Sequence, residues 1–68
     1  MRLTCYIGLL RADDDGRLHT CQNFAPNRPE ARDVVTRLWK RDGWTMIAIR
    51  EATPAELPQL MAGAHILY

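Results

Sequence analysis

NRPEARDVVTRLWKRDG, residues 27–43, carries both end signals and the periodicity of one short amphipathic helix. Asn27 is a favourable N-cap residue, and Glu30 three residues later completes a capping-box pattern. Pro29 falls in the first turn, where its missing N–H costs nothing. Gly43 is the residue type that most readily adopts the left-handed conformation at a helix end. This stretch therefore predicts a helix, and the rest of the chain can be placed around it.

The predicted helix has one apolar face, whose members recur at i, i+3, i+4 and i+7. These members are Ala31, Val34, Val35 and Leu38. Trp39 lies on the flank of this apolar face, beside Arg32. A helix of this length is marginal in water when isolated, so its stability must come from burying the apolar face. The remaining chain has to provide the partner surface.

Length and composition limit the classes of protein that this chain fits. The 68 residues suffice for one domain, which we expect to span residues 1–68. Hydrophobic residues make up 47% and charged residues 25%, as in an ordinary globular domain. The formal net charge of +1 creates no strong attraction to nucleic acid or to a membrane. We expect a thin core without a large enclosed pocket.

The sequence contains no membrane or secretion signal that we recognise. No apolar run approaches the roughly 20 residues that span a bilayer. The N-terminal stretch lacks the small-residue cleavage site of a signal peptide. We therefore expect a cytoplasmic protein without membrane contact, in which Cys5 and Cys21 stay reduced.

The chain before the helix reads as a β-hairpin. Residues 2–11, RLTCYIGLLR, have strand composition, and the DDDG sequence at 13–16 is a turn signal. If Asp15 and Gly16 are the central residues of a type I′ turn, Ile7 faces Phe24 and Leu9 faces Gln22. A three-residue loop with Gly16 in a bulge is the competing arrangement. The first register places on one face Cys5, Ile7, Leu9, Leu18 and Phe24, and on the other Tyr6, Leu10, His19 and Cys21.

The chain after the helix predicts a third strand at residues 44–52, WTMIAIREA. Its alternation places Thr45, Ile47 and Ile49 on one face and Trp44, Met46 and Ala48 on the other. Since both faces are apolar, we expect this strand to be central or covered on both sides. Residues 53–56, TPAE, repeat the capping-box pattern, and Pro58 limits the segment to a single turn or a 3₁₀ piece. AHILY, residues 64–68, is a candidate edge strand.

The predicted order is hairpin, helix, strand, short helical turn and a candidate edge strand. We therefore predict a small single α+β domain, in which one helix packs across an antiparallel sheet.

No pattern in the sequence predicts a metal site or a catalytic site. Counted from Asp13, the twelfth residue is Phe24, whereas a calcium-binding EF-hand loop needs a bidentate Glu there. The soft metal ligands Cys5, His19, Cys21 and His65 include no close cysteine pair of the zinc-site type. Pairing Cys21 with either histidine as nucleophile and base would also need an orienting group and an oxyanion site. We therefore expect no metal, no cofactor and no enzymatic activity.

Aromatic and basic residues are the remaining candidates for function. Trp39 and Trp44, together with arginines, are the residue types that dominate protein–protein hot spots. The predicted partner-binding residues are Trp39, Trp44, Arg32, Arg37, Lys40 and Arg41. The helix cations spread around the polar arc instead of forming a stripe, which favours a solvated face over a nucleic-acid site. The competing interpretation of both tryptophans is that they enlarge a thin core.

By elimination, the sequence predicts a small non-enzymatic module that binds another protein. The element order and size resemble compact phage-encoded proteins that block host machinery, including some anti-CRISPR inhibitors. This resemblance implies inhibition by steric occlusion, with the tryptophans and arginines as anchors. The alternative is a nucleic-acid-binding module that uses Arg28, Arg32, Lys40 and Arg41 on phosphates. Homo-oligomerisation through an edge strand is a third hypothesis.

Overall fold

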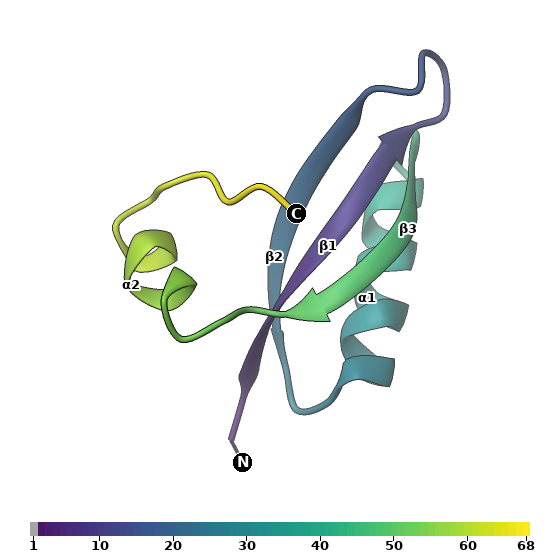
Figure 1. The fold of residues 1–68 in the computed structure, drawn as a ribbon. Helices are drawn as coiled ribbons and strands as arrows, with labels where there is room; N and C mark the ends of the chain where they lie inside the picture. Colours follow the sequence, from purple (N-terminus) through teal and green to yellow (C-terminus); the bar gives the residue numbers. More distant parts are fainter. Residues whose placement is uncertain (1) are drawn as a thin grey trace.

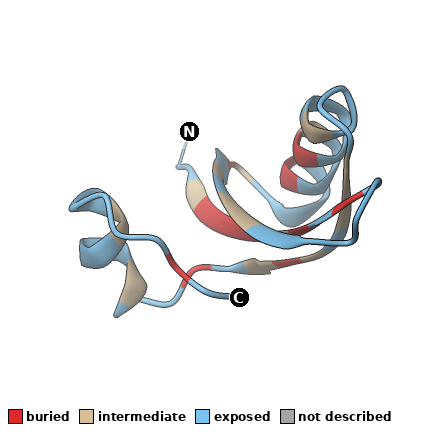
Figure 2. Ribbon diagram, turned by 90° about the horizontal axis from the view of Figure 1, so that it is seen from above, coloured by how far each residue is buried: buried red, intermediate tan, exposed pale blue. Residues whose placement is uncertain are grey.

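The computed structural model describes residues 2–68 as a small α+β domain with a three-stranded antiparallel sheet. The elements are β1 (Thr4–Ala12), β2 (Leu18–Ala25), α1 (Arg28–Lys40), β3 (Trp44–Glu51) and α2 (Glu56–Met61). The strand order is β2-β1-β3, with α1 on one face of the sheet and α2 with the C-terminal segment on the other (Figure 1). The predicted fold class is confirmed, and the described part of the chain forms three layers (Figure 2).

The hairpin turn differs from the predicted type I′ turn and from the three-residue alternative. Residues 13–16 connect Ala12 and Arg17, whose backbones are joined by an N–H···O bond of 2.8 Å. Type I′ geometry needs positive φ at both central residues. Only Gly16 in this turn has it, at +76°. The side chains of Asp14 and Asp15 instead accept backbone N–H groups within the turn.

The predicted hairpin register is therefore wrong by two residues, whereas the predicted faces are right. Ile7 lies opposite Gln22, and Leu9 lies opposite Thr20. A shift of two residues preserves the alternation of side chains, because the strand period is two. Tyr6 and Leu10 accordingly pack beneath α1, and Cys5 and Ile7 pack on the opposite face.

β3 is an edge strand, and β1 is the central strand of the sheet. Of the two alternatives predicted for this strand, a central position or cover on both sides, the central position is therefore wrong. A bulge between Leu9 and Leu10 shifts the β1–β3 register, so Leu9 opposes Ala48 and Leu10 opposes Met46. The bulge places Ile47 outside the regular alternation and leaves it exposed. Ile49 consequently joins Trp44 and Met46 on the α1 side, which corrects the predicted faces of this strand.

The N-terminus of α1 is capped as the sequence predicts. The Asn27 side chain accepts the Glu30 N–H at 3.0 Å, and Pro29 lies in the first turn. The buried face is narrower than predicted: Ala31 and Val35 are in the core, whereas Leu38 is 53% exposed. Trp39 packs against the core in place of Leu38, so the helix is rotated relative to its predicted apolar face.

The second face of the sheet is covered only in part, by Leu60 of α2 and by Ile66 of the chain that follows it, while Leu18 and Phe24 on this face stay exposed. The Glu56 carboxylate accepts two bonds from the Arg50 guanidinium, at 2.8 and 2.9 Å, and one from the Thr53 N–H at 2.8 Å. The last bond is half of the predicted capping box. α2 is a six-residue helix and so exceeds the predicted single turn. Residues 64–68 form no strand, although Ile66 is buried, so the predicted edge strand is wrong.

Candidate functional site

Four aromatic rings from four parts of the chain meet at the turn end of the sheet. We call them the aromatic cluster, which consists of His19, Trp39, Trp44 and His65. The His19 ring is central: its centroid lies 6.2 Å from that of Trp39, 5.8 Å from that of Trp44 and 5.3 Å from that of His65. The two tryptophans meet edge to face, with their centroids 6.4 Å apart. Edge-to-face packing is a favourable geometry for aromatic rings.

The strand register explains why this cluster forms. His19 pairs with Leu10 and Trp44 pairs with Ala12, so both rings project from the α1 side of the sheet. The last turn of α1 carries Trp39 above them. His19 remains exposed, and both tryptophans are half-buried. The tryptophans therefore close one end of the core and also present part of their surface to solvent.

A cation lies beside this cluster. The Arg17 guanidinium carbon is 5.7 Å from the centre of the Trp44 ring, a distance typical of cation–π contact. Arg17 also pairs with Asp15 in the turn, with Nε and Oδ2 2.7 Å apart. The turn thus holds an exposed arginine over an exposed edge of the aromatic cluster.

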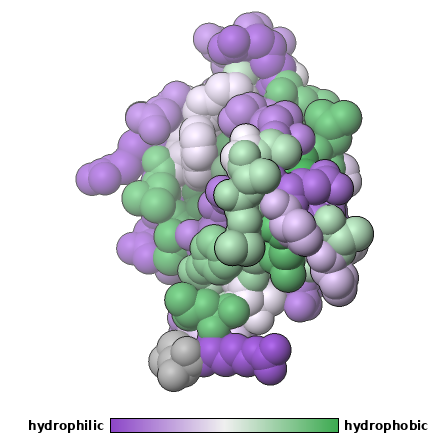
Figure 3. Space-filling model, turned by 90° about the vertical axis from the view of Figure 1, so that its left-hand side faces the viewer, coloured by the Kyte–Doolittle hydropathy of each residue, from purple (hydrophilic) through white to green (hydrophobic). Residues whose placement is uncertain are grey.

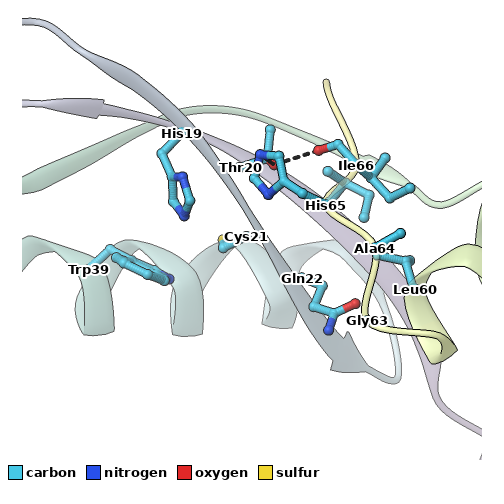
Figure 4. A pocket seen from close by; sticks show the side chains of 11 residues that line it. His19, Thr20, Cys21, Gln22, Trp39, Leu60, Gly63, Ala64, His65 and Ile66 are labelled. Carbon is cyan, nitrogen blue, oxygen red and sulfur yellow. Dashed lines mark hydrogen bonds between the residues drawn. The ribbon is translucent and has the colours of Figure 1, made fainter.

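A groove of about 380 Å³ runs along the outer side of β2, beside the aromatic cluster. His19, Cys21 and Trp39 line it on the α1 side, and the C-terminal segment from Gly63 to Ile66 lines it on the other (Figure 4). Cys21 is half-buried, and burial raises the pKa of its thiol. A raised pKa keeps the thiol protonated at neutral pH, which makes it a poor nucleophile.

His65 lies across the groove at Thr20 and His19. Its Nε2 lies 3.4 Å from the Thr20 hydroxyl, and its ring stacks on that of His19. Thr20 and His19 are neighbours on β2, so their side chains point to opposite faces of the sheet. A ring that contacts both must pass around the edge of β2. The Thr20 hydroxyl also donates to the Ile66 carbonyl, which holds this segment against the strand (Figure 4).

None of the four predicted helix cations makes a cation–π contact with the tryptophans in the described part of the chain. Lys40 Nζ bonds to Asp13 Oδ2 and to Thr45 Oγ1, each at 3.1 Å, so it supports the turn. Arg37 pairs with Asp33 one helical turn earlier at 2.9 Å. Arg37 and Arg41, with Val34 and Leu38, instead line a second, shallow groove of about 310 Å³. Arg32 is exposed on the helix surface.

Of the six predicted partner-binding residues, the structure thus brings Trp39 and Trp44 together in the aromatic cluster, and Arg37 and Arg41 together in the second groove. Sequence reasoning missed Arg17, His19 and His65 as neighbours of these tryptophans. His19 shares the α1-facing parity of Cys21, so the alternation of β2 contained part of the signal. His65 lies 46 residues away along the chain (65 − 19), and no local pattern connects the two.

The side chains of residues 2–68 bear on two further kinds of contact, with a metal ion and with a membrane. In this described part, no group of three or more His, Cys, Asp or Glu side chains is arranged to hold a metal ion. Over the same residues, neither helix has the length and apolar content to cross a bilayer.

Comparison with known proteins provides no assignment. The sequence matches no protein family model, no curated protein and no solved structure at a significant level.

Proposed function

We propose that this protein is a small non-enzymatic module that binds another protein through the aromatic cluster and Arg17. The observation that carries the proposal is the position of His19. It is exposed, it touches both tryptophans and His65, and it lies next to a groove. Half-exposed tryptophans with an adjacent arginine have the composition of an interface hot spot.

The mode of action that fits such a module is steric occlusion. A domain with a thin core can cover a functional surface of its partner without supplying any chemistry. Inhibition of host machinery by a compact phage-type protein, as in the anti-CRISPR class, is the finer form of this proposal. Its support is the resemblance in size and element order, together with the exposed aromatic cluster.

The first experiment is a pull-down with tagged protein from a bacterial lysate, after nuclease treatment, in low and high salt. The proposal predicts one stoichiometric protein partner that survives both treatments, because an apolar interface depends little on salt. Mass spectrometry then identifies the partner. Recovery of nucleic acid alone, lost at high salt, would favour the alternative phosphate-binding function of Arg28, Arg32, Lys40 and Arg41.

Matched variants locate the interface. His19→Ala and Arg17→Ala remove exposed side chains and leave both tryptophans in place, so the fold is expected to survive. Each should weaken partner binding about tenfold or more, as expected for a hot-spot residue. Arg37→Ala, in the second groove and outside the aromatic cluster, is the control and should leave binding unchanged. If only Arg37→Ala weakens binding, the outer face of α1 is the interface and the aromatic cluster is structural.

A further inference from the structure

The outer edge of β2 has backbone groups that no other part of the described chain uses. Ala12 donates its N–H to the Arg17 carbonyl, which makes these two residues a hydrogen-bonded pair. Such pairs alternate along an antiparallel ladder. His19, Cys21 and Asn23 therefore bond to β1.

The residues between them aim their N–H and C=O groups away from β1. These residues are Leu18, Thr20, Gln22 and Phe24. The hydrogen bonds between β1 and β3 agree with this alternation. Cys5, which is not bonded to β2, accepts the Ala52 N–H at 2.9 Å and so points its backbone toward β3. Among residues 2–68, no backbone bond outside the ladder reaches Thr20, Gln22 or Phe24.

The sequence of β2 also lacks the features that usually protect an edge strand from pairing. Its sequence, LHTCQNFA, contains no acidic residue, no lysine, no arginine and no proline. Its register with β1 is continuous, so no bulge twists the edge away. Natural edge strands normally carry one or more of these devices. Phe24 is moreover 58% exposed and shares its face of the sheet with the exposed Leu18. Figure 3 shows apolar side chains reaching the surface on the side of the molecule where Figure 1 draws α2.

The open part of this edge is short and defined at both ends. His65 passes around the edge at Thr20 and blocks it there. Pro26, just beyond the strand, has no N–H to donate. Within residues 2–68, Gln22 and Phe24 are therefore the two outward-facing residues between Thr20 and Pro26 whose backbone N–H and C=O groups have no partner.

We propose that residues 22–24 pair antiparallel with the same residues of a second copy of this chain. In this register Gln22 of each copy lies opposite Phe24 of the other, and Asn23 lies on the twofold axis. Two hydrogen-bonded pairs provide four backbone bonds, two for each pair. The result is one continuous six-stranded sheet, three strands from each copy, with both α1 helices on one face.

The neutrality and the symmetry of this edge favour a second copy as its occupant. Self-pairing places no like charges opposite each other, since the strand carries none of Asp, Glu, Lys or Arg. The same two residues supply every donor and acceptor on both sides, which is the requirement of a twofold contact. This contact uses the end of β2 away from the turn, so it is independent of the proposed aromatic-cluster interface.

The test measures the monomer–dimer equilibrium by sedimentation over a concentration series. Wild-type protein should form a reversible dimer. Gln22→Pro removes the outward N–H without touching the ladder with β1, and it should raise the dimer dissociation constant about tenfold or more. Gln22→Thr retains the N–H and should leave the dissociation constant unchanged. A monomer at every concentration, or equal dimerisation of both variants, would overturn the proposal.

A cross-linking variant tests the register. Both natural cysteines are replaced by alanine, and Asn23→Cys is introduced. Residues opposite each other in such a pair have Cβ atoms about 4.5–5.5 Å apart, close to what a disulfide requires. Mild oxidation should therefore give a covalent dimer. Leu18→Cys in the same background should stay monomeric, because His65 blocks that end of the edge. Equal cross-linking at both positions, or none at Asn23→Cys in folded protein, would contradict this register.

Discussion

Glu56 is the carboxylate that this fold perturbs most among the described residues. The Arg50 guanidinium and the Thr53 N–H stabilise its charged form and lower its pKa from 4.5 to about 2. The folded pKa lies below the unfolded pKa, so ionised Glu56 stabilises the fold above about pH 4.5. This stabilisation should be lost as the pH falls from about 4.5 toward about 2. Urea unfolding at a series of pH values measures it.

Glu56→Gln provides the comparison for this pH dependence. The variant should be less stable at neutral pH and should show a flatter stability profile between about pH 4.5 and about pH 2. Glu51→Gln, on an exposed neighbouring carboxylate, is the control and should keep the wild-type profile. An unchanged profile in Glu56→Gln would mean that other carboxylates cause the acid sensitivity.

At the scale of the element, the orientation of α1 buries Val35 and exposes Leu38, although both residues are aliphatic. Val35 is 2% exposed beneath the helix, and Leu38 is 53% exposed. Val35→Ala should lower the free energy of unfolding by about 1–2 kcal/mol, because it removes two buried methyl groups and leaves a cavity. Leu38→Ala should change it by less than about 0.5 kcal/mol. Chemical denaturation measures the free energy of unfolding of both variants. A larger loss of stability in Leu38→Ala would support the helix face that the periodicity alone predicts.

For the whole molecule, the C-terminal segment acts as part of the third layer. Ile66 is 8% exposed, the Thr20 hydroxyl bonds to its carbonyl, and Arg50 lies over the Tyr68 ring. Ile66→Ala should therefore cost about 2 kcal/mol, a substantial share of the stability of a small domain. Leu67→Ala, at a site that is 80% exposed, should be nearly neutral. Thermal unfolding compares them, and equal midpoints would show that this segment does not stabilise the sheet.

Local signals in the sequence were sufficient for most elements. The cap at Asn27, the proline in the first turn and the glycine after the helix each act within a few residues, so α1 was predicted with its correct start. Strand alternation likewise predicted which hairpin residues share a face, since this property survives a register error of two. The contact between Trp39 and Trp44 depends on packing between α1 and β3, and their predicted role in binding a partner stays a prediction.

Sequence patterns therefore predict the order of the elements from β1 to α2, the α+β class and the two faces of the hairpin, but they also predict an edge strand at 64–68 that does not form. Tertiary packing sets the turn register, the bulge in the β1–β3 pairing and the rotation of α1 that packs Trp39, instead of Leu38, against the core. It also decided the contact of His65 with His19 across the edge of β2. The two groups of features differ in how far apart along the chain the interacting residues lie. Caps and alternation depend on neighbours along the chain, whereas register, helix rotation and the aromatic cluster depend on packing between segments that are distant in sequence.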